Sequence, residues 1–88
     1  MVVDGRRWRA TDPDIPDDVR ARLQSHLGSA RSAVRTAKRA GDDDALAAAR
    51  ERVGTAEHGL GERGTPWWEL DADARRERWT EALAALEG

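Results

Sequence analysis

The chain lacks cysteine, phenylalanine and tyrosine altogether. Without cysteine it can form no disulfide, no thiolate nucleophile and no thiolate metal site. This absence is compatible with a reducing compartment, so the cytoplasm is the expected location. No apolar run approaches the roughly 20 residues that span a bilayer, and the opening MVVDGRRWR lacks the apolar stretch of a signal peptide. We therefore expect a soluble protein that is not exported and has no membrane span.

Aromatic side chains are scarce, and all of them are tryptophans. The four tryptophans of the 88 residues are Trp8, Trp67, Trp68 and Trp79. A chain of this length forms one domain and buries only about 60 to 65% of the surface that its unfolded form exposes. Each large side chain therefore matters to the core, and we expect residues 1–88 to form a single small domain pinned by tryptophans.

An excess of positive charge is missing too. Lys and Arg number 15 against 17 Asp and Glu, which gives a net charge of −2. Bulk electrostatics therefore does not favour binding to a polyanion. Any interaction with nucleic acid would have to depend on a local basic patch.

Constellations for catalysis or metal binding are also missing. The acidic clusters 17–18 and 42–44 stand at expected helix starts, where capping and the helix dipole account for them. His26 and His58 fall on facing helices but on different flanks, and no third ligand converges with them. We expect no enzyme activity, no cofactor and no metal, with His26 hydrogen-bonded beneath the last helix and His58 solvated.

The pattern that is present predicts a mainly α-helical fold. Asp4-Gly5 between two short apolar or basic runs is a hairpin turn signal, so a small N-terminal β-hairpin is expected. Helices are predicted over about 17–40 and 43–61, separated by Gly41, and over about 72–86, capped by Asp71. The last helix carries Trp79, Leu83 and Leu86 on one face.

The first two helices both show the heptad spacing of coiled-coil seams. Folding the chain back at Gly41-Asp42 places large residues opposite small ones in all facing pairs but the last, as close packing requires. In each facing pair the residue numbers sum to 83, and the pairs are Ala37 with Leu46, Val34 with Ala49, Ala30 with Val53, Leu27 with Ala56, and Leu23 with Leu60. We therefore predict a long antiparallel α-hairpin.

The same register sorts the two flanks of the hairpin. One flank is too charged to bury and faces water; it pairs Gln24 with Glu57, Arg31 with Arg50 and Lys38 with Asp43, and places Arg35 beside them. The other flank is small or weakly polar, and the third helix and the tryptophans should dock on it. Its residues are Val19, His26, Ser29, Ala33, Thr36, Ala40, Ala45, Thr55 and Gly59.

Two groups of residues are candidates for contact with a partner. The dipeptide Trp67-Trp68 follows Pro66, and in an extended segment one indole would lie inside and one partly outside; tryptophan is enriched among interface hot spots. The second group is Arg31, Arg35 and Arg50, because like charges that face each other across a hairpin favour a bound anion or acidic partner. The structural alternative for these arginines is a solvated, salt-screened basic face.

The N-terminal run VVDGRRWR raises a separate question. On a strand, Trp8 points to one face while Arg7 and Arg9 point to the other. A basic and aromatic nucleic-acid ribbon is one interpretation. We favour the other, in which Trp8 covers the core.

The motifs VVDGRRWRATDP and GERGTPWW, separated by a helical hairpin rich in alanine and arginine, resemble a group of short uncharacterised proteins from high-GC actinobacteria. The resemblance covers most of the chain. Some members bear the name of a Tol-type biopolymer transporter, which fits poorly with a sequence that lacks a membrane span. The resemblance implies no functional residue.

These observations favour a non-catalytic protein-interaction or adaptor module in the cytoplasm. Its partner would be another protein or a second copy of the chain, in a homodimer. The alternative is a nucleic-acid-binding accessory protein that uses Arg7, Arg9, Arg31, Arg35 and Arg50. Salt dependence separates the two, because phosphate contacts weaken steeply with salt whereas an apolar interface does not.

Overall fold

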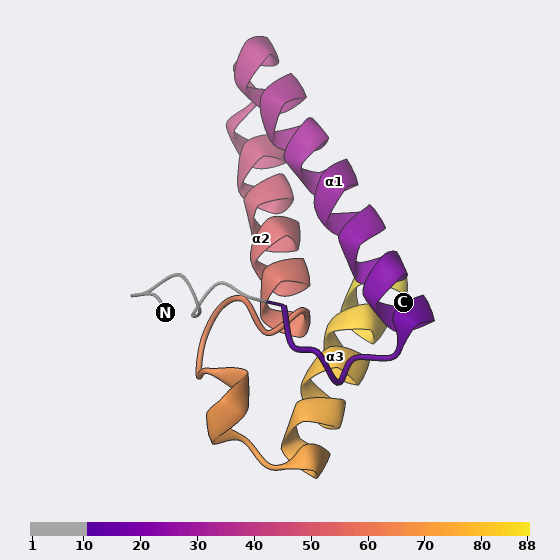
Figure 1. Cartoon of the computed structure of the whole chain (residues 1–88). Helices are drawn as coiled ribbons and strands as arrows, with labels where there is room; N and C mark the ends of the chain where they lie inside the picture. The colour runs from indigo at the N-terminus through magenta and orange to yellow at the C-terminus, as the bar shows by residue number, and fades with distance from the viewer. Residues whose placement is uncertain (1–10) are drawn as a thin grey trace, which may run out of the picture.

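The computed structural model describes residues 11–88, and this part of the chain is all-helical. Its elements, in chain order, are α1 (Asp17–Ala40), α2 (Asp43–Gly59), the 3-10 turn η2 (Trp67–Glu69) and α3 (Ala72–Glu87). Figure 1 shows α1 and α2 as a long antiparallel hairpin with α3 beside its base. The predicted β-hairpin and the predicted burial of Trp8 lie outside the described residues.

The helices begin and end where local chemistry predicts. Gly41 adopts the left-handed φ of 68° and ends α1, a conformation that glycine reaches without steric cost. The side chain of Asp42 accepts a hydrogen bond from Ala45 N at 3.0 Å, and that of Asp71 accepts one from Ala74 N at 2.8 Å. Both are N-caps. The three predicted helices are therefore confirmed to within two residues at every end.

Most of the predicted hairpin seam is buried. Val34, Leu46 and Val53 are half-buried, and the buried members, from α1, α2 and the residue after α2, are Leu23, Leu27, Ala30, Ala37, Ala49, Ala56 and Leu60. Leu27 and Ala56 share one core cluster with Leu23 and Leu60. Side-chain contacts between the helices agree with an antiparallel arrangement, since Arg52 Nη2 donates to Ser29 Oγ at 3.4 Å while Arg31 reaches Glu57.

The third helix covers only the base of the small-residue flank. Ala82 is buried in the same core cluster as Leu23, and Trp79, Leu83 and Leu86 pack against that cluster while staying partly exposed. The distal part of this flank is open and forms a shallow hollow, lined by Ser29, Ser32, Ala33, Thr36, Ala37, Ala40, Asp42 and Ala45. The predicted docking of α3 on this flank is therefore seen at its base, and the hairpin extends well beyond α3 (Figure 1).

The close approach of α3 to the hairpin depends on one glycine. A Cβ atom added to Gly59 would lie 2.5 Å from Ala82 Cβ and 3.2 Å from Leu23 Cδ2. Real carbon atoms pack at about 3.5 to 4.0 Å, so no larger residue fits without separating the helices. By contrast, a Cβ at Gly28, in the middle of α1, would meet nothing within 4 Å.

Among residues 11–88, no helix combines the length and the apolar character needed to cross a bilayer.

We predict that Gly59→Ala and Gly28→Ala change stability in opposite directions. Gly59→Ala should lower the free energy of unfolding by about 1 to 3 kcal/mol because the core is overpacked. Gly28→Ala should raise it by about 0.5 to 1 kcal/mol, since alanine is the better helix former and the site is open. Urea unfolding followed by circular dichroism measures both. A Gly59→Ala protein as stable as the wild type would contradict the close packing of α3.

Candidate functional site

A buried carboxylate anchors the base of the molecule. Asp12 is only 2% exposed, and its side chain accepts hydrogen bonds from Arg75 Nε at 2.9 Å, from Arg75 Nη2, and from Asp14 N at 2.9 Å. The backbone N–H of Asp12 donates to Leu60 O at 2.9 Å. The segment before α1, the residue that follows α2 and the first turn of α3 thus meet at Asp12, through its backbone and its side chain.

The ion pair determines the charge state of Asp12. Burial by itself raises the pKa of this carboxyl. The hydrogen bond from Arg75, the backbone hydrogen bond from Asp14 and the positive charges of Arg75 and Arg78 outweigh burial, so the net pKa of Asp12 lies below its usual value. The hydrogen bond to Asp12 in turn raises the pKa of the Arg75 guanidinium. Both groups are therefore charged over the whole neutral range.

Arg75 also supports the two adjacent tryptophans, which we call the tryptophan ledge (Trp67 and Trp68). The Arg75 guanidinium carbon lies 5.0 Å from the centroid of the Trp67 ring, which is within cation–π range. The two indoles meet edge to face, with centroids 5.1 Å apart and an interplanar angle of 88°. Trp67 is half-buried and Trp68 is 43% exposed. One indole is more exposed than the other, as predicted, although the dipeptide forms a 3-10 turn and neither indole is fully buried.

The loop that leads to the ledge fits closely against it. Gly61 and Gly64 have φ values of 83° and 84°, which favour glycine. A Cβ on Gly61 would also lie 3.0 Å from Asp12 Cβ and 3.2 Å from Trp67 Cδ1. The loop, the anchor and the ledge therefore form one packed unit.

Arg78 ties the same loop to α3. It is 8% exposed, and its Nη1 donates to the carbonyl oxygen of Thr65 at 2.7 Å. Burial lowers the pKa of its guanidinium. Nη2 is buried and has no hydrogen-bond partner in the described part of the chain.

The three candidate arginines of the hairpin differ in their ion pairing. Arg31 Nη2 pairs with Glu57 Oε2 at 3.3 Å, and Arg63 reaches the same carboxylate at 2.8 Å. The register predicts Gln24 opposite Glu57 and Arg50 opposite Arg31, whereas in the structure the Glu57 carboxylate contacts both Arg31 and Arg63. Arg35 and Arg50 are exposed, and neither makes an ion pair within residues 11–88.

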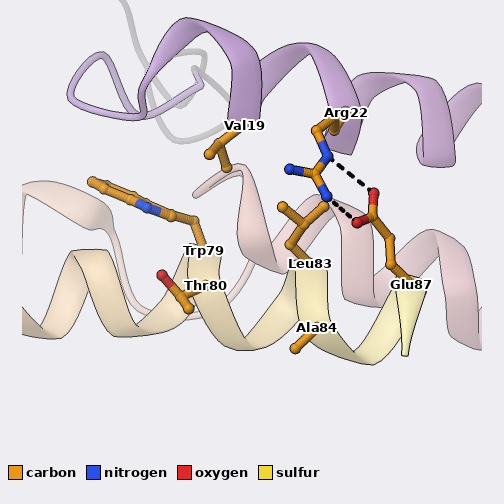
Figure 2. A pocket seen from close by; sticks show the side chains of 7 residues that line it. All are labelled: Val19, Arg22, Trp79, Thr80, Leu83, Ala84 and Glu87. Atoms are coloured by element: carbon orange, nitrogen blue, oxygen red, sulfur yellow. Dashed lines mark hydrogen bonds and ion pairs between the residues drawn. The ribbon is translucent and has the colours of Figure 1, made fainter.

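A second surface feature lies between α1 and α3, where Figure 2 shows an open groove. Its apolar lining comes from Val19, Trp79 and Leu83, and its volume is about 270 Å³. Arg22 and Glu87 stand at its edge and form an ion pair, with Arg22 Nε 3.2 Å from Glu87 Oε2. The groove separates two helices that touch only near the base.

The imidazole of His26 also contacts Glu87, with Nε2 at 2.8 Å from Glu87 Oε2. The hydrogen bonds from Arg22 first and His26 second lower the pKa of Glu87. His26 is thus hydrogen-bonded beneath α3 and His58 is exposed, as predicted. Among residues 11–88, no group of three or more potential ligands is placed to hold a metal ion.

Sequence reasoning missed the Asp12–Arg75 anchor. The two residues are 63 positions apart, and nothing local distinguishes Arg75 from its neighbours Arg76 and Arg78. The available signal was the TDPD segment, in which an aspartate before a proline favours a side-chain-capped turn. That signal identifies Asp12 as a turn residue but does not identify its partner.

Comparisons with protein-family models, with curated proteins and with solved structures found no match. The resemblance carried by VVDGRRWRATDP and GERGTPWW therefore stays an expectation. A function for this chain has to be argued from its own residues.

We predict that Asp12→Asn destabilises the fold whereas Asp14→Asn does not. Asp12→Asn removes a charge-assisted pair and leaves Arg75 without its main partner, which should lower the free energy of unfolding by about 2 to 3 kcal/mol. Asp14 also contacts Arg75, at 2.9 Å, but its side chain is 63% exposed, so Asp14→Asn should cost at most about 0.5 kcal/mol. Chemical unfolding at pH 7 compares them. Equal effects would contradict the anchoring role.

We also predict a specific acid dependence. The pKa of Asp12 is lower in the folded chain than in the unfolded one, where it is about 3.9, so its stabilising contribution is complete above that value. The contribution is lost as the pH falls from about 5 through the folded pKa. The stability difference between the wild type and Asp12→Asn should therefore be constant from pH 7 to about 5 and shrink on further acidification. A difference that persists undiminished at about pH 2 would contradict this assignment.

Proposed function

We propose that the chain is a non-catalytic protein-interaction module and that the tryptophan ledge is its contact with a partner protein. The observation that carries the proposal is the exposure of Trp68. Within residues 11–88 it is the one large hydrophobic side chain that is exposed, at 43%. An indole offers a large apolar area for a partner to bury, and tryptophan is enriched among interface hot spots.

The support beneath Trp68 favours binding. Asp12 holds Arg75, Arg75 stacks on Trp67, and Trp67 meets Trp68 edge to face. A side chain that is ordered before binding loses less conformational entropy when the complex forms. Tryptophan combines this low entropy cost with a large contact area, and it is common at interface hot spots.

The partner is another protein, and a second copy of the chain is the first candidate to test. A homodimer would bring two equivalent patches together around a two-fold axis. Each ledge would then cover its counterpart or an adjoining surface of the other subunit.

The alternative function, nucleic-acid binding through the arginines of the hairpin, has weaker support. Arg31 already pairs with Glu57, and the net charge of the chain is −2. Arg7, Arg9 and Trp8 lie outside the described residues, and the three described tryptophans lie on η2 and α3, away from Arg35 and Arg50, so none of these three is at hand to stack on a base.

We predict that Trp68→Ala and Trp67→Ala separate binding from folding. Trp68→Ala should weaken association by about 2 kcal/mol, roughly 30-fold in Kd, and should leave the melting temperature nearly unchanged. Trp67→Ala should lower the melting temperature by several degrees, because Trp67 contacts both Arg75 and the Gly61 loop. Sedimentation across a range of concentrations measures self-association, and calorimetry measures melting.

If sedimentation shows only monomers, the wild-type chain and the Trp68→Ala chain are each used as bait, and the proteins that the two baits capture are purified and compared. A partner bound by the wild type and lost by Trp68→Ala supports the ledge. Wild-type and Trp68→Ala chains with the same oligomeric state and the same partners would refute it.

A further inference from the structure

Positive charge is concentrated on α1. From Val19 to Gly41 the chain contains no aspartate and no glutamate, and its six basic residues are Arg20, Arg22, Arg31, Arg35, Lys38 and Arg39. The acids of the molecule lie before this stretch, on α2 and on the segment that includes α3. The net charge of −2 therefore hides a segregated distribution.

The cations near the base of α1 are neutralised within the chain. Arg20 pairs with Asp17 at 3.0 Å, Arg22 pairs with Glu87, and Arg31 pairs with Glu57 at 3.3 Å. Beyond Arg31 this compensation stops, because α3 and its acids reach only the base of the hairpin (Figure 1). In the described part of the chain, no ion pair involves the exposed cations of the distal half, which are Arg35, Lys38, Arg39 and Arg50.

Three of these unpaired side chains, Arg35, Lys38 and Arg50, share one flank with Arg31, which pairs with Glu57; we call these four residues the cationic flank. Arg31, Arg35 and Lys38 recur at steps of four and three residues, so they lie on one side of α1 over about 10 Å. Arg50 precedes Glu57 by two helical turns on α2, and Glu57 contacts Arg31. The register thus places Arg50 on the same flank, farther toward the tip.

Apolar surface accompanies these charges. Val34 on α1 and Leu46 on α2 are seam residues that stay half-buried, whereas the alanines of the distal seam are fully buried. Helical spacing places Val34 next to Arg31 and Arg35, and Leu46 one turn from Arg50. A ligand on this flank would therefore meet a band of apolar atoms bordered by unpaired cations.

We propose that the cationic flank binds an acidic amphipathic helix of a partner protein. Carboxylates spaced by one and two helical turns match the spacing of Arg31, Arg35 and Lys38, and apolar residues of the same helix would cover Val34 and Leu46. Pairing relieves the repulsion between like charges at neighbouring positions. This contact is independent of the tryptophan ledge, which lies at the opposite end of the molecule from the hairpin tip (Figure 1).

The acids on the same flank favour a helix over a nucleic acid. Glu57 adjoins Arg31, and Asp43 lies on this flank near Lys38 by the register. A phosphate backbone is negative along its whole length and would meet both carboxylates. A protein helix can place a lysine or a neutral residue opposite each of them. The mixture of cations and carboxylates on this flank therefore favours a protein helix over a nucleic acid.

Fluorescence anisotropy with the full chain tests the proposal. The probe is a labelled amphipathic peptide of about 20 residues, long enough to form a helix, with glutamates at i, i+4 and i+7 beside a leucine stripe. The comparison ligands are the same peptide with glutamine at those positions and an oligothymidine of about 20 nucleotides. All are measured at about 0.15 M salt, where charges farther apart than roughly 8 Å are screened.

Arg35→Glu and Arg76→Glu form the matched pair of variants. Both reverse one exposed arginine, but Arg76 lies on α3 and its nearest carboxylate is that of Asp73, at 3.6 Å. The glutamate peptide should bind the wild type more tightly than the glutamine peptide does. Its Kd should rise about tenfold in Arg35→Glu and less than about twofold in Arg76→Glu, while Trp68→Ala should not alter it. Circular dichroism verifies that each variant is folded.

Several results would overturn the proposal. Equal losses in the two arginine variants would show a general charge effect. Equal binding of the glutamate and glutamine peptides, or no binding of either, would show that the flank does not select carboxylates. Tighter binding of the oligothymidine, with the same sensitivity to Arg35→Glu, would assign the flank to nucleic acid.

Discussion

A carboxylate that is shielded from water must be paired, and in this chain that requirement joins segments that are far apart in sequence. Asp12 meets Arg75 across 63 positions, and its backbone N–H binds the end of α2. Large apolar side chains are few, and the core cluster consists of Ile15, three leucines and two alanines. The polar anchor therefore fixes an arrangement that so small a core would otherwise specify weakly.

The same arginine connects the interior to the surface. The edge of the Arg75 guanidinium binds Asp12 and Asp14, while its face covers Trp67. Trp68 then rests on Trp67 and extends into solvent. The two adjacent tryptophans thus differ in their surroundings, since Trp67 contacts Arg75 and Trp68 is exposed, and the support of the exposed indole includes the Asp12–Arg75 ion pair.

Features that depend on local chemistry could be predicted from the sequence. The helix ends follow from Gly41, Asp42 and Asp71, and the hairpin seam follows from a period that both helices share. Features that depend on distant residues could not: α2 and α3 contact each other through Gly59, whose role appears only when Ala82 lies beside it. The candidate site divides in the same way: the alternation of an extended segment predicted that one of the two adjacent indoles would be partly exposed, but not which one, and the pairing of Arg31 with Glu57 needed the side-chain geometry.

The alanine-rich distal seam gives the hairpin a graded resistance to local opening. Near the base, Leu23, Leu27 and Leu60 are buried beside α3, whereas nearer the tip the fully buried residues are Ala30, Ala37 and Ala49. Each alanine removes far less apolar surface from water than a leucine does. We therefore expect backbone amides near Gly41 to exchange through subglobal fluctuations that leave the base intact, with a lower opening free energy than amides at the anchored end.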